Sequence, residues 1–257
     1  MTATISTPRV KRFPRFDRTE RAVHWTNAAL FLILIATGAS LKLDFLSTRV
    51  ANRHTVKTIH VYSGLLLPIP VLLGLVLHSG AQFRRDLGRL NRWTTDDRRW
   101  WSRRRRKHAQ LGKFNPGQKL NAAFIGASIV VMLMTGAIMK WFEPFPDSWR
   151  TGATFVHDSV WLVLIFVIAG HILFAFRDPD SLRGILAGWV PESWARRERP
   201  QWWAEIVEAR AASADAAGDV VAGANERGGE AGNRAGEVAV GDPVDGGAAD
   251  GVGGGEL

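Results

Sequence analysis

The stretch "HDSVWLVLIFVIAGH", residues 157–171, decides the fold class of this 257-residue chain. It lies in an apolar window, residues 155–176, that is long enough to cross a bilayer core of about 30 Å, which takes about 20 helical residues. His157 and His171 are 14 residues apart, close to four helical turns, so both rings leave one helix face about 21 Å apart. We therefore predict a transmembrane helix with an imidazole at each of two membrane depths.

Three further windows have the same length and apolar character, and they are Trp25–Leu43, Ile59–Ser79 and Leu120–Trp141. The second of them contains Pro68 and Pro70. Proline lacks the backbone donor of a regular helix, so we expect a kink at that point. The predicted fold is an all-α membrane protein, a four-helix transmembrane bundle.

Lysine and arginine are unevenly distributed among the segments that connect the windows. The segment before the first window, the loop 80–119 and residues 177–200 carry 24 of them, whereas the two connections on the opposite side carry six. Because cytoplasmic segments are enriched in Lys and Arg, we expect both termini and the long loop to be cytoplasmic. We interpret the basic run Arg103–Lys107 as a contact with anionic membrane lipid, and we expect no nucleic-acid partner.

Composition divides the chain into four parts. Residues 1–23 are a cytoplasmic N-terminal segment, 24–176 the membrane domain, 177–210 a cytoplasmic C-terminal segment, and 211–257 a tail rich in Gly, Ala and acidic residues. Such a tail has too little apolar surface to offset the entropy lost on ordering. We therefore predict that the tail is disordered.

The chain has no cysteine. This excludes disulfides, thiolate nucleophiles and iron–sulfur ligation within the chain. No zinc-protease, nucleophile-elbow, phosphate-loop or dinucleotide motif stands where it could work. Any iron–sulfur cluster must therefore belong to a partner, and we predict no catalytic residue in this chain.

Four histidines pair by their depth in the predicted membrane. His24 lies at the cytoplasmic level of His171, and His60 lies at the outer level of His157. Ionisable groups within spans are costly and usually mark a site. Two level-matched pairs in a four-helix bundle suit two b-type haems stacked across the membrane. The alternative is that these histidines pack or hydrogen-bond at the interface without a cofactor.

The other three histidines have weaker claims. His78 ends the second window on the cytoplasmic side, so it competes with His24 as the partner of His171. An interfacial or quinone-site role is the alternative for His78. His54 and His108 lie in loops and are most simply solvated.

Several stretches resemble the cytochrome b (gamma) subunit of membrane-bound, quinone-reducing formate dehydrogenase. They are "RFDRTERAVHWTNAALFLILIATG" (15–38), "HVYSG" (60–64), "GKFNPGQKL" (112–120), the span with its two histidines, and "SLRGILAGWVPESWARRERPQWWAEI" (181–206). The resemblance covers about residues 13–208. The helix and histidine features are also similar to those of nickel–iron hydrogenase cytochromes b and b561-type cytochromes. The loop "GKFNPGQKL" and the C-terminal segment 181–206 are more specific to the formate dehydrogenase branch.

The resemblance implies which residues bind cofactors. His60 and His157 would hold the outer haem b and His24 and His171 the inner one, the same pairing as depth indicates. Asn115, Gly117 and Gln118 would form a menaquinone-like site near the inner haem, and amides are suitable hydrogen-bond donors to a quinone carbonyl. By itself, "NPGQ" favours a plain turn before a helix, and only the resemblance favours the quinone site. Lys119 is either a further donor or a side chain that snorkels to the interface.

Two features depart from the family's pattern. Pro116 stands where the family loop commonly has a small residue, which puts the shape of that loop in doubt. The acidic tail is an extension to which we assign no role.

The resemblance also implies partners and location. The chain would pass electrons from an iron–sulfur subunit across a bacterial inner membrane to a quinone, within a formate dehydrogenase complex whose molybdenum or tungsten subunit oxidises formate. The alternatives are a hydrogenase cytochrome b, a stand-alone b561-type cytochrome, and a haem-free transporter.

Overall fold

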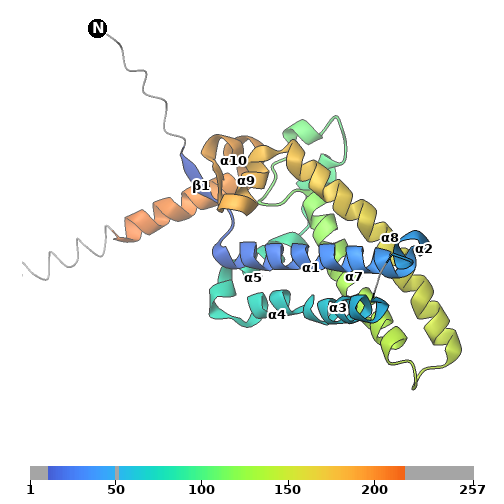
Figure 1. Ribbon diagram of the computed structural model, residues 1–257. Coiled ribbons are helices and arrows are strands. Elements are labelled where there is room, and N and C mark those ends of the chain that lie inside the picture. The colour runs from blue at the N-terminus through green and yellow to red at the C-terminus, as the bar shows by residue number, and fades with distance from the viewer. Residues whose placement is uncertain (1–10, 50–51, 218–257) are drawn as a thin grey trace, which may run out of the picture. The chain divides into compact units, whose positions relative to one another are not determined.

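Long apolar helices form the body of the computed structural model, which describes residues 11–49 and 52–217 (Figure 1). Within these residues four helical segments are long and apolar enough to cross a membrane, which confirms the predicted fold class. Each begins four to eight residues before its predicted window, where mostly polar residues extend the helix, and the first three end one to three residues before that window does. The segments are α1 (Arg18–Lys42), α3 (Arg53–Leu66) with α4 (Ile69–Val76), α7 (Pro116–Lys140) and α8 (Asp147–Arg177).

The second segment is broken where the sequence predicted a kink. Helix α3 ends at Leu66, Leu67 donates its N–H to the Gly64 carbonyl, and α4 begins at Ile69. Pro68 precedes α4, and Pro70 lies in its first turn, where a missing N–H costs little. The break therefore falls where proline removes backbone donors from the helical ladder.

The helices pack as two antiparallel pairs. Helix α1 packs against α3 and α4, α7 packs against α8, and α3 also contacts α7. One end of the bundle, called here the hairpin end, holds the connections from α1 to α3 and from α7 to α8. The other end, called the loop end, holds the start of α1 and α7 and the end of α4 and α8 (Figure 1).

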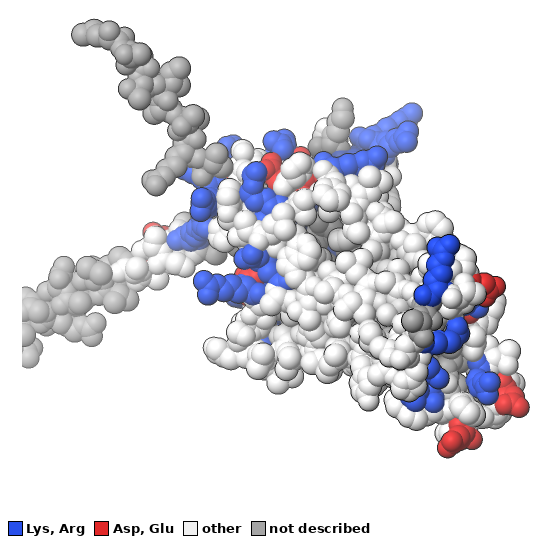
Figure 2. Space-filling view, in the orientation of Figure 1, with Lys and Arg blue, Asp and Glu red and all other residues white. Residues whose placement is uncertain are grey.

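The sides of the bundle are apolar and exposed. Val76 is 82% exposed, Phe155 72% and Phe166 70%. A water-soluble protein rarely presents so large an apolar surface. In Figure 2 a broad uncharged face lies between regions that carry the charged side chains. This distribution fits a surface that faces lipid, with charges at the two water interfaces.

A small folded cap lies at the loop end. Strand β1 (Arg12–Pro14) pairs antiparallel with β2 (Trp189–Pro191), and Phe13 lies opposite Val190. The side chains of Phe13, Val190, Trp194 and Trp202 are almost completely buried and form its core. The sequence did not predict this sheet. The short helices are α2 (Asp44–Ser47), η1 (His78–Gly80), α5 (Ala81–Asn91), α6 (Thr95–Trp100), η2 (Arg106–His108), α9 (Pro179–Ala187) and α10 (Glu192–Glu198).

The described part of the C-terminal region ends in a helix. Residues 205–217 lie outside the compact unit that contains the bundle. Residues 205–217 are helical and mostly exposed, so the helix continues past 210, where we expected order to end. Alanine is the strongest helix former, and five of the seven residues from 211 to 217 are alanine. The rest of the predicted tail, 218–257, lies outside the described residues.

Candidate functional site

The four histidines singled out by depth lie together as two pairs. His60 of α3 faces His157 of α8 at the hairpin end, with the ring centres 6.2 Å apart and the ring planes at 64°. His24 of α1 faces His171 of α8 at the loop end, with the ring centres again 6.2 Å apart and the planes at 53°. We call these the hairpin-end pair and the loop-end pair. Helix α8 contributes one imidazole to each.

The separation of the rings suits one metal ion between each pair. A metal bonded at about 2 Å to one nitrogen of each ring would hold the ring centres roughly 6 Å apart, since each centre lies about 1 Å behind its nitrogen. Among the described residues no cluster of three or more His, Cys, Asp or Glu could hold a metal. Each pair therefore fits a metal whose remaining ligands come from a cofactor, as in a haem.

Hydrogen bonds orient the hairpin-end pair. The Thr37 hydroxyl lies 2.9 Å from His60 Nδ1, and the Thr135 hydroxyl lies 3.0 Å from His157 Nδ1. Each hydroxyl also lies close to the carbonyl one helical turn before it, Ile33 at 2.7 Å and Val131 at 2.8 Å. A hydroxyl has one hydrogen, so it donates to that carbonyl and accepts from the imidazole Nδ1–H. The other ring nitrogen, Nε2, then keeps its lone pair for a metal.

Glycines keep space open beside these rings. A Cβ at Gly38 would lie 3.5 Å from His60 Cε1 and 3.2 Å from Trp161 Nε1, and a Cβ at Gly136 would lie 3.6 Å from His157 Cε1. A larger side chain at either position would enter the volume next to the imidazole. A flat cofactor between helices needs that volume.

Two buried polar atoms near the pairs have no hydrogen-bond partner among the described residues. Trp161 Nε1 lies one turn of α8 beyond His157, and Asn27 Oδ1 lies three residues beyond His24 in α1. An unpaired buried polar atom costs about 1–3 kcal/mol, so such atoms are rare unless something else pairs with them. Their presence at both levels is consistent with a polar edge of a bound group, and the residues present fit haem.

The other histidines lie away from the pairs. His78 is exposed in η1, beyond the end of α4, and the described ring that contacts His171 is His24. The geometry thus favours His24 over His78 as the partner of His171. His54 and His108 are exposed, His54 in the first turn of α3 and His108 at the end of η2.

The predicted quinone residues form the start of α7. The Asn115 side chain accepts the Gln118 N–H at 2.8 Å, and the Gln118 side-chain oxygen accepts the Asn115 N–H at 3.0 Å. This capping box uses both amide oxygens and leaves both side-chain NH₂ groups as donors. Pro116 occupies the first helical position, where its fixed φ and missing N–H are tolerated, so the helix start absorbs this departure from the family's pattern. A Cβ at Gly117 would lie 3.6 Å from the Trp100 ring, which covers this turn.

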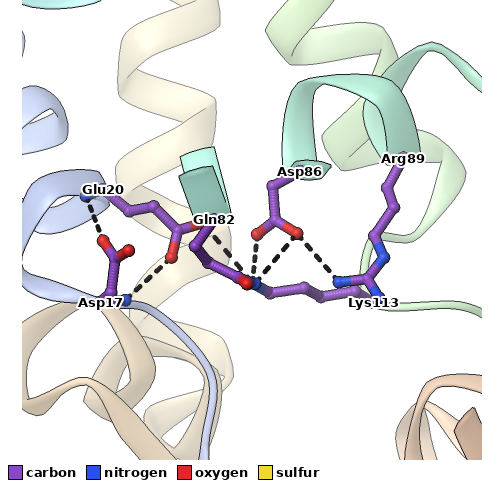
Figure 3. Close-up of polar contacts among 6 residues, drawn as sticks. All are labelled: Asp17, Glu20, Gln82, Asp86, Arg89 and Lys113. Atoms are coloured by element: carbon purple, nitrogen blue, oxygen red, sulfur yellow. Dashed lines mark hydrogen bonds and ion pairs between the residues drawn. The ribbon is translucent and has the colours of Figure 1, made fainter. Parts of the chain in front are cut away.

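Buried lysines flank this turn on both sides. Lys113 is 2% exposed and pairs with Asp86 and, at 3.5 Å, with Glu20 (Figure 3). Lys119 is 6% exposed and donates to Asp97 at 2.6 Å. Lys119 also donates to the Arg92 carbonyl at 2.7 Å, so its ammonium is engaged in an ion pair and neither snorkels nor points freely at a ligand.

The environment of Lys113 is strongly electrostatic. Burial lowers the pKa of Lys113, and the charges of Asp86 and Glu20 partly oppose that effect. Arg89 and Gln82 also bond the Asp86 carboxylate, at 3.1 and 3.5 Å (Figure 3). The cluster joins the first turn of α1, helix α5 and the segment before α7, so it fixes the turn at Asn115 relative to His24.

Sequence reasoning missed the threonine–histidine contacts and the lysine clusters. A signal for the former exists, because a Thr-Gly dipeptide occurs in the first window at 37–38 and again in the third at 135–136. Each Thr bonds a histidine of the neighbouring helix, and each Gly leaves room beside the same ring. No comparable pattern marks Lys113 or Lys119, whose partners lie 22 to 93 residues away.

The sequence of this chain is similar to those of proteins named as cytochrome b subunits. The E. coli K12 protein "Formate dehydrogenase, nitrate-inducible, cytochrome b556(Fdn) subunit" is 26% identical over 200 residues, 75% of this chain and 90% of that protein. The Haemophilus influenzae "Formate dehydrogenase, cytochrome b556 subunit" is 27% identical over 205 residues, 76% and 84% respectively. A second E. coli K12 protein, "Formate dehydrogenase, cytochrome b556(fdo) subunit", is 23% identical over 206 residues, 75% and 92%.

A family model also matches the whole membrane domain. The matched residues are 15–188, and the family is described as prokaryotic cytochrome b561. This range contains all four spanning segments and both histidine pairs. A cytochrome b carries haem b, for which the histidine pairs supply suitable ligands. The chain belongs to the prokaryotic cytochrome b561 family.

Proposed function

We propose that this protein is a dihaem b-type cytochrome subunit that passes electrons across the membrane from an iron–sulfur partner to a quinone. The observation that carries the proposal is the presence of two histidine pairs at opposite ends of one bundle, each with ring centres 6.2 Å apart. Bound at such a pair, haem b supplies one-electron oxidation and reduction at its iron.

The chain's own residues hold and orient this cofactor. His60 and His157 are the ligands at the hairpin end, and His24 and His171 are the ligands at the loop end. In the hairpin-end pair the threonine hydroxyls select the tautomer that presents Nε2 to the metal.

The quinone site lies at the start of α7. Reduction of a quinone takes two electrons and two protons, so the site needs donors to the carbonyls and access to a water-filled side. The Asn115 and Gln118 NH₂ groups are available as donors beside the Trp100 ring that covers this turn. The loop end carries most of the basic residues of the connecting segments, and by the positive-inside rule this supports a cytoplasmic location for it.

The partners follow from the relatives and from composition. Three relatives are named as cytochrome b556 subunits of formate dehydrogenase, which supports a complex with the iron–sulfur and molybdenum- or tungsten-containing subunits of such an enzyme. This chain has no cysteine for a cluster, so clusters that feed it belong to another subunit. Formate oxidation also takes place elsewhere, and this chain resides in the bacterial inner membrane.

Spectroscopy of the purified protein tests the cofactor part of the proposal. Reduced-minus-oxidised spectra and a pyridine haemochrome should show two haems b per chain, and His157→Ala should remove one of them. His54→Ala is the matched control and should retain both, because His54 is exposed and away from the pairs. A parent protein without haem, expressed with adequate haem supply, would overturn the proposal.

Co-purification tests the partner. Mild solubilisation from the native membrane should recover this chain with an iron–sulfur subunit and a molybdenum or tungsten subunit active on formate. Recovery with a nickel–iron hydrogenase, or recovery alone with full quinone reductase activity, would replace formate dehydrogenase by the corresponding alternative.

A further inference from the structure

The two histidine pairs differ in their hydrogen bonds. At the hairpin end both Nδ1 atoms bond a threonine hydroxyl, Thr37 for His60 and Thr135 for His157. At the loop end no described residue hydrogen-bonds the ring of His24 or His171. The nearest ring to His24 other than His171 is the indole of Trp25, which meets it edge to face at 5.3 Å.

The threonine contacts are links in longer chains. Each imidazole donates to a hydroxyl, and that hydroxyl donates to a helix carbonyl at 2.7 or 2.8 Å. Chains of this kind polarise one another, so the imidazole bears more negative charge than an isolated ring. A ligand made more basic in this way binds Fe(III) more strongly relative to Fe(II), which lowers the reduction potential.

Surrounding charge acts in the same direction. Near the hairpin-end pair, Asp158 follows His157 in α8 and is neutralised by Lys42 at 2.6 Å, so it adds little net field. The segments at the loop end carry 24 Lys and Arg, against six in those at the hairpin end. An excess of positive charge favours the reduced form, which holds one more electron, and therefore raises the potential at the loop end.

We infer that Thr37 and Thr135 are positioning residues that lower the reduction potential of the haem held by His60 and His157 below that of the haem held by His24 and His171. Electrons then run downhill from the hairpin end to the loop end, where the turn at Asn115 lies. This inference rests on the proposed dihaem function and adds which of the two haems has the lower reduction potential. It also gives the repeated Thr-Gly pairs of α1 and α7 one common purpose.

Redox titration of the purified holoprotein, followed by optical absorbance, tests the inference. The parent should titrate as two one-electron components, and His60→Ala should remove the one of lower potential. Thr37→Val and Thr135→Val should each raise the lower potential and leave the higher one unchanged. We expect the double variant to raise the lower reduction potential by about 59 mV, which for one electron changes the equilibrium ratio of electrons on the two haems about tenfold.

Matched variants separate the hydrogen bond from packing. Thr37→Ser keeps a hydroxyl and should keep the parent potential, and Thr26→Val, at an exposed threonine of the same helix, should change neither potential. The low-spin haem signal in electron paramagnetic resonance should change for the hairpin-end component alone. If the valine variants lose haem, Thr37→Ala tests the hydrogen bond instead, because it removes the hydroxyl without adding a methyl group at its place.

The outcomes are distinguishable. If two haems are bound but the lower reduction potential is unchanged in the valine, alanine and double variants, this inference is overturned and the dihaem proposal stands. A rise in the higher potential instead would also overturn it. A parent that binds no haem would overturn the dihaem proposal itself.

Discussion

Replacing Lys113 by methionine tests whether the buried cluster beside α1 is a true charge balance. Methionine has a similar length and no charge. In the parent, the carboxyl groups of Glu20 and Asp86 face two cations, Lys113 and Arg89, with Asp86, Glu20 and Lys113 at most 7% exposed. The variant removes one partner of the buried pair of Lys113 and Asp86, and breaking a buried pair in this way costs about 3–5 kcal/mol. The desolvation penalty of the lysine is also lost in the variant and offsets part of this cost, so we expect a loss of about 3 kcal/mol at pH 7.

Thermal unfolding of the detergent-solubilised holoprotein, monitored by tryptophan fluorescence at pH 7, measures this effect. At pH 7 the midpoint should fall by roughly 10 °C, since about 1 kcal/mol corresponds to about 2–4 °C for a chain of this size. Lys42→Met is the control, because Lys42 pairs with Asp158 but is 56% exposed, and solvent screens such a pair so that it stabilises the fold little. An unchanged midpoint at pH 7 would refute the charge-balance reasoning.

Three further substitutions probe the two sites. Gly136→Val should cost one haem, because a side chain at this position begins 3.6 Å from His157 Cε1, whereas Gly126→Val, where a Cβ meets nothing within 4 Å, should keep both haems by absorbance. Asn115→Ala should destabilise the start of α7 by about 1 kcal/mol and raise the KM for a quinone analogue more than it lowers kcat, with haem content unchanged. Trp161→Phe removes an indole N–H that has no partner among the described residues, and it should shift the visible spectrum of one haem only. A shift in both haems, or in neither, would contradict that placement of Trp161.

Local patterns in the sequence predicted much of the membrane domain. Hydropathy over about 20 residues is a property of each segment alone, so the four spans and the break near Pro68 could be read directly. The depth of each histidine follows from its place in its span. Depth in turn predicted that His60 would meet His157 and His24 would meet His171, and both contacts are present in the fold.

The helix start at Asn115 shows where a local pattern was ambiguous. "NPGQ" was compatible with a turn or with a ligand site, and the structure shows a capping box that uses the amide oxygens. The two interpretations need not exclude each other, since the NH₂ groups remain as donors. Local sequence predicts the cap, but only the packing of Trp100 over Gly117 shows what surrounds it.

Contacts between distant segments were decided by tertiary structure alone. The pairing of β1 with β2 joins residues 12–14 to 189–191, and the bond between Lys113 and Glu20 spans 93 residues. The hydroxyl of Thr37 selects the tautomer of His60 only because α1 and α3 pack face to face. Sequence therefore determined which residues lie at each membrane depth, because burial in lipid acts on every segment separately. The tertiary structure decided which of them touch, because side-chain contacts depend on the rotation of each helix about its axis, which hydropathy does not specify.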